Sequence, residues 1–130
     1  MKKVIKALSF VGVCTAFITG CGEKNVSFQN DIRPIFAKNC LECHQPGAEG
    51  FDKSGFAIGN YESLMAGTKP TGSKQRGQVI IPGDSASSTL IILVEGRADP
   101  SIRMPHNKEP LDEKDVAILK KWIDEGAKNN

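Results

Sequence analysis

Two cysteines and a histidine stand together in the run Cys40-Leu-Glu-Cys43-His44. Residues three positions apart on a helical turn lie on one face, so a turn through this run brings both thiols to the same side. Of the four cysteines in the chain, the other two, Cys14 and Cys21, lie near its start. The run is therefore expected to fold as a turn that presents two thiols and an imidazole to one common ligand.

This spacing is typical of the covalent attachment of a c-type haem. The thiols of Cys40 and Cys43 can form thioethers with the two vinyl groups on one edge of a haem, and His44 can supply the proximal ligand to the iron. The motif occurs once, so we expect one covalently bound haem c. A large apolar macrocycle would also complete a core for which the aromatic content, 6% of residues, is low.

Three other interpretations compete for the same residues. A structural zinc site takes four ligands, usually from two separated pairs, whereas the chain offers one pair of cysteines with His44 and His106. A thioredoxin-like redox pair needs a βαβ context, and the sequence shows none. A disulfide between Cys40 and Cys43 would suit an exported protein but leaves the histidine without a role. The motif therefore favours haem.

A second axial ligand is expected from a methionine. Met104 lies in the proline-rich loop 96–111, where prolines reduce the entropy lost in holding a weak thioether against iron. Met65 lies in an apolar stretch, where methionine more often fills a gap in the core. We predict Met104 as the distal ligand. The main alternative is His106, which would give two histidine ligands, and a vacant sixth position is a further one.

The first 20 residues have the character of an export signal. Three lysines precede a run without charge from Ala7 to Thr19, which has the length of a signal-peptide core and is too short to span a bilayer. The run Ile18-Thr-Gly-Cys21 resembles the lipobox of bacterial lipoproteins. This resemblance implies cleavage before Cys21 and lipid on its thiol, where several acyl chains give stable anchoring. A plain secretory signal is the alternative.

Cleavage would change the charge and the organisation of the chain. The full chain carries 17 basic and 15 acidic residues, and loss of three lysines leaves 14 basic residues and a net charge of about −1. Such a balanced surface argues against nucleic-acid binding. We divide the chain into a signal peptide (1–20), a lipidated cysteine with a short tether (21–27) and one domain (28–130).

From residue 28 onward the chain resembles the single-haem class I cytochromes c, and among them the planctomycete type. The likeness is carried by Phe28 with Asp31–Phe36, by Cys40–His44, by Ile81–Asp84 with Ser88–Leu90, by Arg103–Pro105 and by Trp122–Ala127. The residues Gln45-Pro46 depart from the pattern, since the family often has glycine after the histidine. The resemblance implies an all-α fold, with helices wrapped around one covalently bound haem and long Gly-rich loops. It also implies His44 and Met104 as axial ligands, and electron transfer.

The residues at the two ends of this domain independently predict helices. Asp31 can cap a first helix with Pro34 in its first turn. Asp112 can cap a last helix with an apolar stripe through Trp122 and a stop at Gly126. In cytochromes of this class the first and last helices cross.

Between these ends the sequence is rich in glycine. We predict a long loop over 45–78, interrupted by a small helix around Tyr61–Ala66. Beyond it, Asp84 or Ser85 can cap a further helix that runs to Val94 and stops at Gly96.

Two protein ligands on the iron would leave no open position for a substrate, so we predict an electron carrier and no catalytic role. The expected partners are redox proteins, which the sequence does not identify, and a membrane reached through the lipid anchor. The expected location is the periplasmic or cell-surface side of a bacterial membrane. The alternative function is a haem-based sensor or gas-binding module, with a labile or absent sixth ligand.

Overall fold

The computed structural model describes residues 24–130. The predicted signal peptide and the predicted lipidation site Cys21 lie outside the described residues. Among residues 24–130, no helix is both long and apolar enough to cross a membrane.

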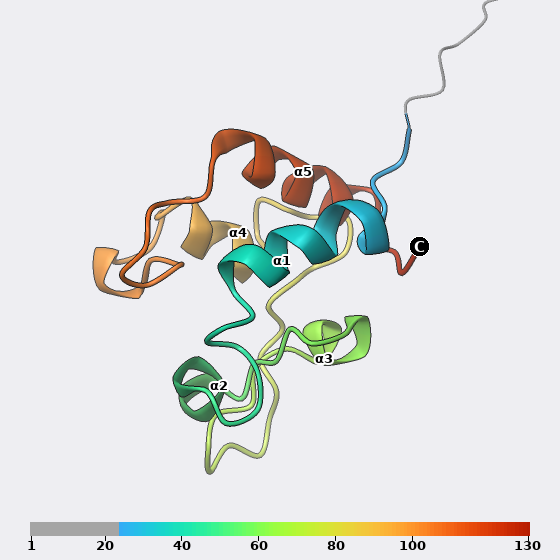
Figure 1. The fold of residues 1–130 in the computed structure, drawn as a ribbon. Helices are drawn as coiled ribbons and strands as arrows, with labels where there is room; N and C mark the ends of the chain where they lie inside the picture. Colours follow the sequence, from blue (N-terminus) through green and yellow to red (C-terminus); the bar gives the residue numbers. More distant parts are fainter. Residues whose placement is uncertain (1–23) are drawn as a thin grey trace, which may run out of the picture.

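Helices and connecting loops make up the described chain (Figure 1). The elements are the π-helical turn η1 (Phe28–Ile32), α1 (Arg33–Asn39), α2 (Glu49–Ser54), α3 (Tyr61–Ala66), α4 (Thr89–Val94), the 3-10 turn η2 (Pro100–Ile102) and α5 (Glu113–Asp124). Between residues 24 and 130 the β-type pairing is limited to one isolated bridge, Thr68 with Gly77. The predicted all-α class is therefore confirmed for the described residues.

The first helix begins earlier than the sequence predicted. Ser27 is its N-cap: the Ser27 hydroxyl accepts from the Asn30 amide at 3.2 Å, and the Asp31 carboxylate accepts from the Ser27 amide at 2.8 Å. The prediction that Asp31 caps this helix is wrong, because this reciprocal pair already satisfies the first free amides. Pro34 consequently lies inside a continuous helix, directly after the wider π-helical turn. The π-helical turn therefore lies just before Pro34, whose backbone nitrogen has no N–H to donate.

The last helix is the one that the sequence predicted. The Asp112 carboxylate accepts from the Asp115 amide at 2.7 Å, and the helix ends just before Gly126, whose φ is +97°. The fully buried side chains of α5 are Leu119, Trp122 and Ile123. Helix α5 thus presents the predicted apolar stripe to the core.

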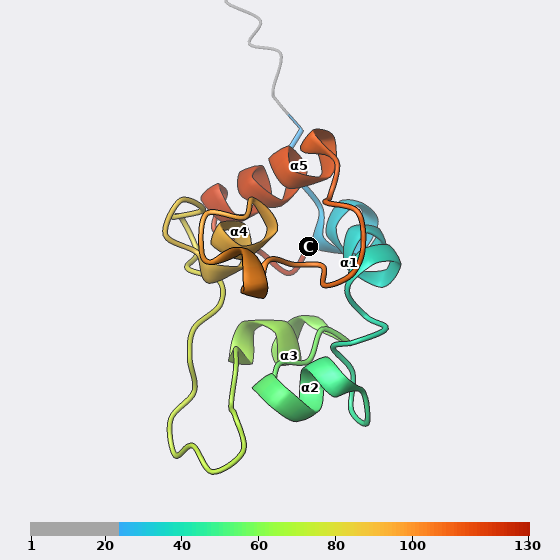
Figure 2. The same ribbon diagram turned by 90° about the vertical axis from the view of Figure 1, so that its left-hand side faces the viewer.

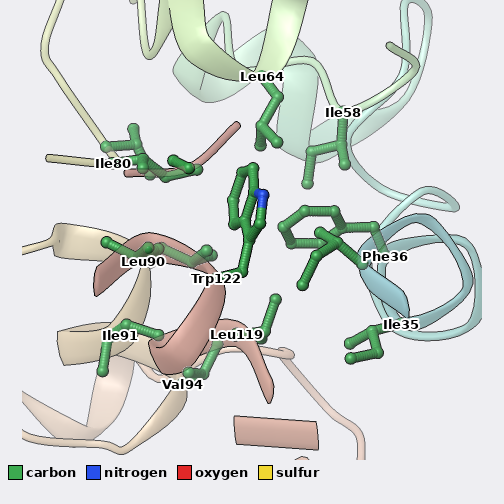
Figure 3. Close-up of a cluster of buried hydrophobic side chains, with 14 of the residues drawn as sticks. Ile35, Phe36, Ile58, Leu64, Ile80, Leu90, Ile91, Val94, Leu119 and Trp122 are labelled. Atoms are coloured by element: carbon green, nitrogen blue, oxygen red, sulfur yellow. The ribbon is translucent and has the colours of Figure 1, made fainter. Parts of the chain in front are cut away.

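The first and last helices pack together, as expected for this fold (Figure 1). The ring of Phe28 in η1 lies 5.7 Å from the ring of Trp122. Figure 3 shows Trp122 at the centre of the core, with Phe36 of α1 on one side, Leu90 of α4 on the other and Leu64 of α3 above it. The indole N–H donates to the carbonyl of Lys128 at 2.9 Å. One aromatic side chain therefore joins four helices.

Helix α4 is shorter than predicted. It begins at Thr89 after the N-cap Ser88, and the Asp84 carboxylate instead accepts from the Ser87 amide within the preceding turn. The Ser88 hydroxyl donates to the carbonyl of Asp84 at 2.7 Å and accepts from the Ile81 amide at 2.8 Å. These bonds tie the turn to the preceding segment, so residues 84–88 do not join the helix.

The Gly-rich stretch contains two short helices and an extended arm. Helix α3 matches the prediction for Tyr61–Ala66, whereas α2 was not predicted. Residues 68–77, here called the arm, project away from the helices (Figure 2) and are closed at their base by the Thr68–Gly77 bridge. Gly67 directly precedes the arm with φ +71°, and a Cβ there would lie 2.1 Å from the Gly77 carbonyl oxygen. The base of the arm therefore requires glycine.

The two ends of the described chain are fastened together. The Val26 amide donates to the Glu125 carboxylate at 2.8 Å. The Phe28 amide donates to the side chain of Asn130 at 2.9 Å, and the Gln29 amide donates to its backbone oxygen at 3.1 Å. Among residues 24–130, the first hydrogen bond to the rest of the domain is thus made by Val26.

Candidate functional site

The cysteine-histidine motif forms a tight turn directly after α1. The Cys40 amide donates to the Phe36 carbonyl at 2.9 Å and so ends α1. The amides of Cys43 and His44 both donate to the Cys40 carbonyl, at 3.2 and 3.0 Å. Cys40 is half-buried, Cys43 is exposed, and the two thiols are not bonded to each other. The turn predicted from the motif is therefore present, and both thiols remain free for another bond.

The backbone of this turn is supported by the segment that follows it. The Cys43 carbonyl accepts from the Phe51 amide at 2.9 Å, and the His44 carbonyl accepts from the Ile58 amide at 2.9 Å. A Cβ on Gly50 would lie only 2.8 Å from the Cys43 oxygen. Glycine at this position therefore lets α2 lie directly against the motif.

A cavity of about 510 Å³ opens beside the motif. This volume falls in the range of about 300–1,000 Å³ that is usual for cofactor and ligand sites. The site residues predicted from the sequence that line it are Cys40, Cys43, His44, Met104 and His106. Most of the remaining wall is apolar and includes Phe56, Ile58, Val79, Leu90, Leu93 and Leu111. The fold thus brings residues from positions 39 to 111 around one space.

The imidazole of His44 is oriented by a backbone carbonyl. Its Nδ1 lies 3.3 Å from the Phe56 oxygen, and the Phe56 ring stands edge-on to it at 5.4 Å. Because a carbonyl can only accept, Nδ1 carries the proton and Nε2 keeps its lone pair. Burial lowers the pKa of His44; the Phe56 carbonyl opposes this effect and the nearby His106 adds to it. His44 is therefore a neutral imidazole at neutral pH, with Nε2 free to bind a metal ion.

The thiol of Cys40 is not a reactive thiolate. Burial raises the pKa of Cys40 to about 11, against a smaller opposite effect of Lys108. Catalytic redox pairs instead have thiol pKa values below about 8.5. The thioredoxin-like interpretation of the motif is therefore disfavoured by the environment of the first cysteine.

The loop after α4 carries Met104 to the cavity. The Met104 amide donates to the Leu93 carbonyl at 3.2 Å, and the side chain packs partly buried against the core. Met65 also packs partly buried against the core, but it is not among the residues that line the cavity. His106 lines the cavity with Met104, although it is exposed.

The residues around the cavity fit a haem c. Two thiols, one neutral imidazole and one thioether in a largely apolar space form the donor set that this group needs. A tetrahedral metal site fits less well, because residues 24–130 contain no group of three or more His, Cys, Asp or Glu arranged to hold a metal ion. The sequence did not reveal the carbonyl of Phe56 or the close approach of Gly50. Each of these contacts, of Phe56 with His44 and of Gly50 with Cys43, involves backbone atoms that come together only when the chain folds.

Comparison with known proteins gave one match. A family model described as Planctomycete cytochrome C matches residues 40–107, which is just over half of the chain. The match begins at the first cysteine of the motif and extends past Met104 and His106. No curated protein and no solved structure matched the chain.

Proposed function

The chain belongs to the planctomycete cytochrome C family, and from this premise we propose that it is a single-haem electron carrier with His44 and Met104 as axial ligands, held at a membrane through Cys21. Membership in this family implies haem-based electron transfer. The ligands and the anchor are the proposed part. One observation carries the ligation: His44 and Met104 line the same cavity as the two motif cysteines.

When bound, haem c supplies an iron that exchanges single electrons between Fe(III) and Fe(II). Cys40 and Cys43 hold the group through thioethers, which are not reducible as a disulfide is. The Phe56 carbonyl orients His44 through Nδ1 and leaves Nε2 for the iron.

The surroundings of the cavity favour the reduced state. A methionine ligand raises the reduction potential relative to a second histidine. The apolar wall also disfavours the additional positive charge of Fe(III). We therefore expect a positive reduction potential. With both axial positions filled by the chain, we expect no catalytic turnover at the iron.

An absorption spectrum of the exported protein tests the ligation. The oxidised protein should show the weak far-red band of methionine ligation, and the reduced protein should show a sharp α-band. Met104→Ala should abolish the far-red band, whereas the matched control Met65→Ala should retain it. Loss of the band in Met65→Ala alone would refute the assignment. Strong binding of CO by the reduced wild-type protein would favour the sensor or gas-binding alternative.

The membrane anchor is supported by the lipobox-like run and by the short distance in sequence between Cys21 and the attachment of Val26 to the domain. Val26 is bound to Glu125, and the five Cα-to-Cα steps from Cys21 to Val26 span at most about 18 Å when extended. A lipid on Cys21 would hold the domain close to the membrane surface. Cys21→Ala should move the protein from the membrane to the soluble fraction, whereas Cys14→Ala should not. Retention of Cys21→Ala in the membrane fraction would contradict the anchor.

A further inference from the structure

An ion pair joins two segments on the rim of the cavity. The Lys108 ammonium donates to the Glu42 carboxylate across a separation of 66 positions in the sequence. Glu42 lies between the two motif cysteines, and Lys108 lies four residues after Met104. The pair therefore connects the motif to the loop that carries the proposed distal ligand.

This loop has few other attachments near Met104. The Met104 amide is bound to Leu93, and Leu111 packs partly buried against the core. Between these two points, in the described structure, residues 105–110 form one hydrogen bond to the rest of the chain, through Lys108. The ion pair is thus the one hydrogen-bonded attachment of this segment among the described residues.

Both partners are charged at neutral pH. The hydrogen bond from Lys108, followed by its charge, holds the pKa of Glu42 below its usual value of 4.5. The same bond raises the pKa of Lys108 above 10.5. The side chain of Lys108 is 40% exposed and that of Glu42 is 75% exposed. The pair is thus an intact ion pair that water and salt can reach.

We propose that Glu42 and Lys108 are positioning residues that hold the Met104 segment of the loop against the cysteine-histidine motif and so oppose displacement of Met104 from the iron. The second half of this statement rests on the proposed ligation. A thioether is a weak ligand, and it competes with any stronger base that enters the cavity. Fixing the loop lowers the entropy lost when Met104 binds, so weakening the ion pair favours the competitor.

Imidazole is a suitable probe of this competition. Oxidised holoprotein is titrated with imidazole, and the loss of the far-red band is followed. Lys108→Gln and Glu42→Gln should each bind imidazole about two- to fivefold more tightly than the wild type, the range expected for one exposed ion pair. The charge-exchanged double variant Glu42→Lys/Lys108→Glu should restore an affinity near that of the wild type.

Lys120→Gln is the matched control. Lys120 is 42% exposed and pairs with Glu95, linking α5 to the end of α4 instead of holding the loop segment after Met104. Its imidazole affinity should equal that of the wild type. At high salt, where the screening length falls to about 3 Å, the difference between Lys108→Gln and the wild type should shrink.

Hydrogen exchange separates the two parts of the proposal. The Met104 amide, which donates to the Leu93 carbonyl, should exchange faster in Lys108→Gln than in Lys120→Gln. Equal exchange and equal imidazole affinity in these two variants would overturn the proposal, even with the far-red band present in the wild type. A wild type without the band would instead refute the ligation by Met104. Faster exchange in Lys108→Gln would then still support the role of the ion pair in holding the loop.

Discussion

Preventing haem attachment should abolish the cooperative folding of this domain. In the variant Cys40→Ala/Cys43→Ala, the apolar wall of the cavity would be left to solvent. At about 24 cal/mol per Å³ of unfilled cavity, a volume of about 510 Å³ corresponds to about 12 kcal/mol. This figure is an upper bound, because the cavity opens to solvent. Even half of it, about 6 kcal/mol, lies within the whole stability of a domain, about 5–15 kcal/mol, so little stability should remain.

The unfolding of this variant can be followed by two independent signals. Far-UV circular dichroism reports the helices, and fluorescence reports Trp122, the single tryptophan, which is fully buried in the core. Urea should produce a gradual change without a sharp transition. The control is the unsubstituted chain made in a host that cannot attach haem, which separates loss of the haem from loss of the thiols. A sharp transition with the same midpoint by both signals, in both samples, would refute the reasoning.

Three further predictions concern the holoprotein in urea unfolding. Trp122→Phe removes the donor to a carbonyl that it binds at 2.9 Å, which should cost at least about 1 kcal/mol; an unchanged midpoint would contradict this. Gly67 and Gly72 both have positive φ, and Gly72→Ala should cost about 1–2 kcal/mol for this reason alone. Gly67→Ala should destabilise the fold clearly more, because of the two glycines only Gly67 meets a backbone oxygen within 4 Å. Hydrogen bonds from the hydroxyl and then the amide of Ser87 hold the pKa of Asp84 below 3.8. The stability from this carboxylate is thus present above pH 3.8 and lost as the pH falls further, and Asp84→Asn should flatten the acid side of the stability profile.

The elements that the sequence predicted well are those whose signals are local. Helix α5 carries its own cap at Asp112, its apolar stripe and its stop, all within 15 residues. Helix α3 likewise has the reciprocal cap between Asn60 and Ser63. Such signals act before the rest of the chain has folded. The haem motif belongs to the same group, because five adjacent residues define it.

The elements that the sequence did not predict depend on contacts between distant segments. Helix α2 lies between glycines that indicate a loop, yet it packs against the motif because Gly50 permits a close approach to Cys43. The capping error at the first helix has another cause. Ser27 and Asp31 can each cap a helix, and only their reciprocal hydrogen bonds decide which of them begins it. The Glu42–Lys108 pair joins positions 66 apart and has no local signal.

The two proposed axial ligands are held with unequal firmness, and this difference bears on function. His44 is fixed on a turn whose backbone is bonded to α2 and to Ile58, and its ring is bonded to Phe56. Met104 itself is bound by one backbone hydrogen bond, from its amide to Leu93, and the segment after it is bound by one exposed ion pair four residues later. If a ligand is displaced, it is therefore the methionine. A carrier and a gas-binding module could both be built on His44 and Met104. They would differ mainly in how firmly this loop holds Met104 in place. The imidazole titration measures that property directly.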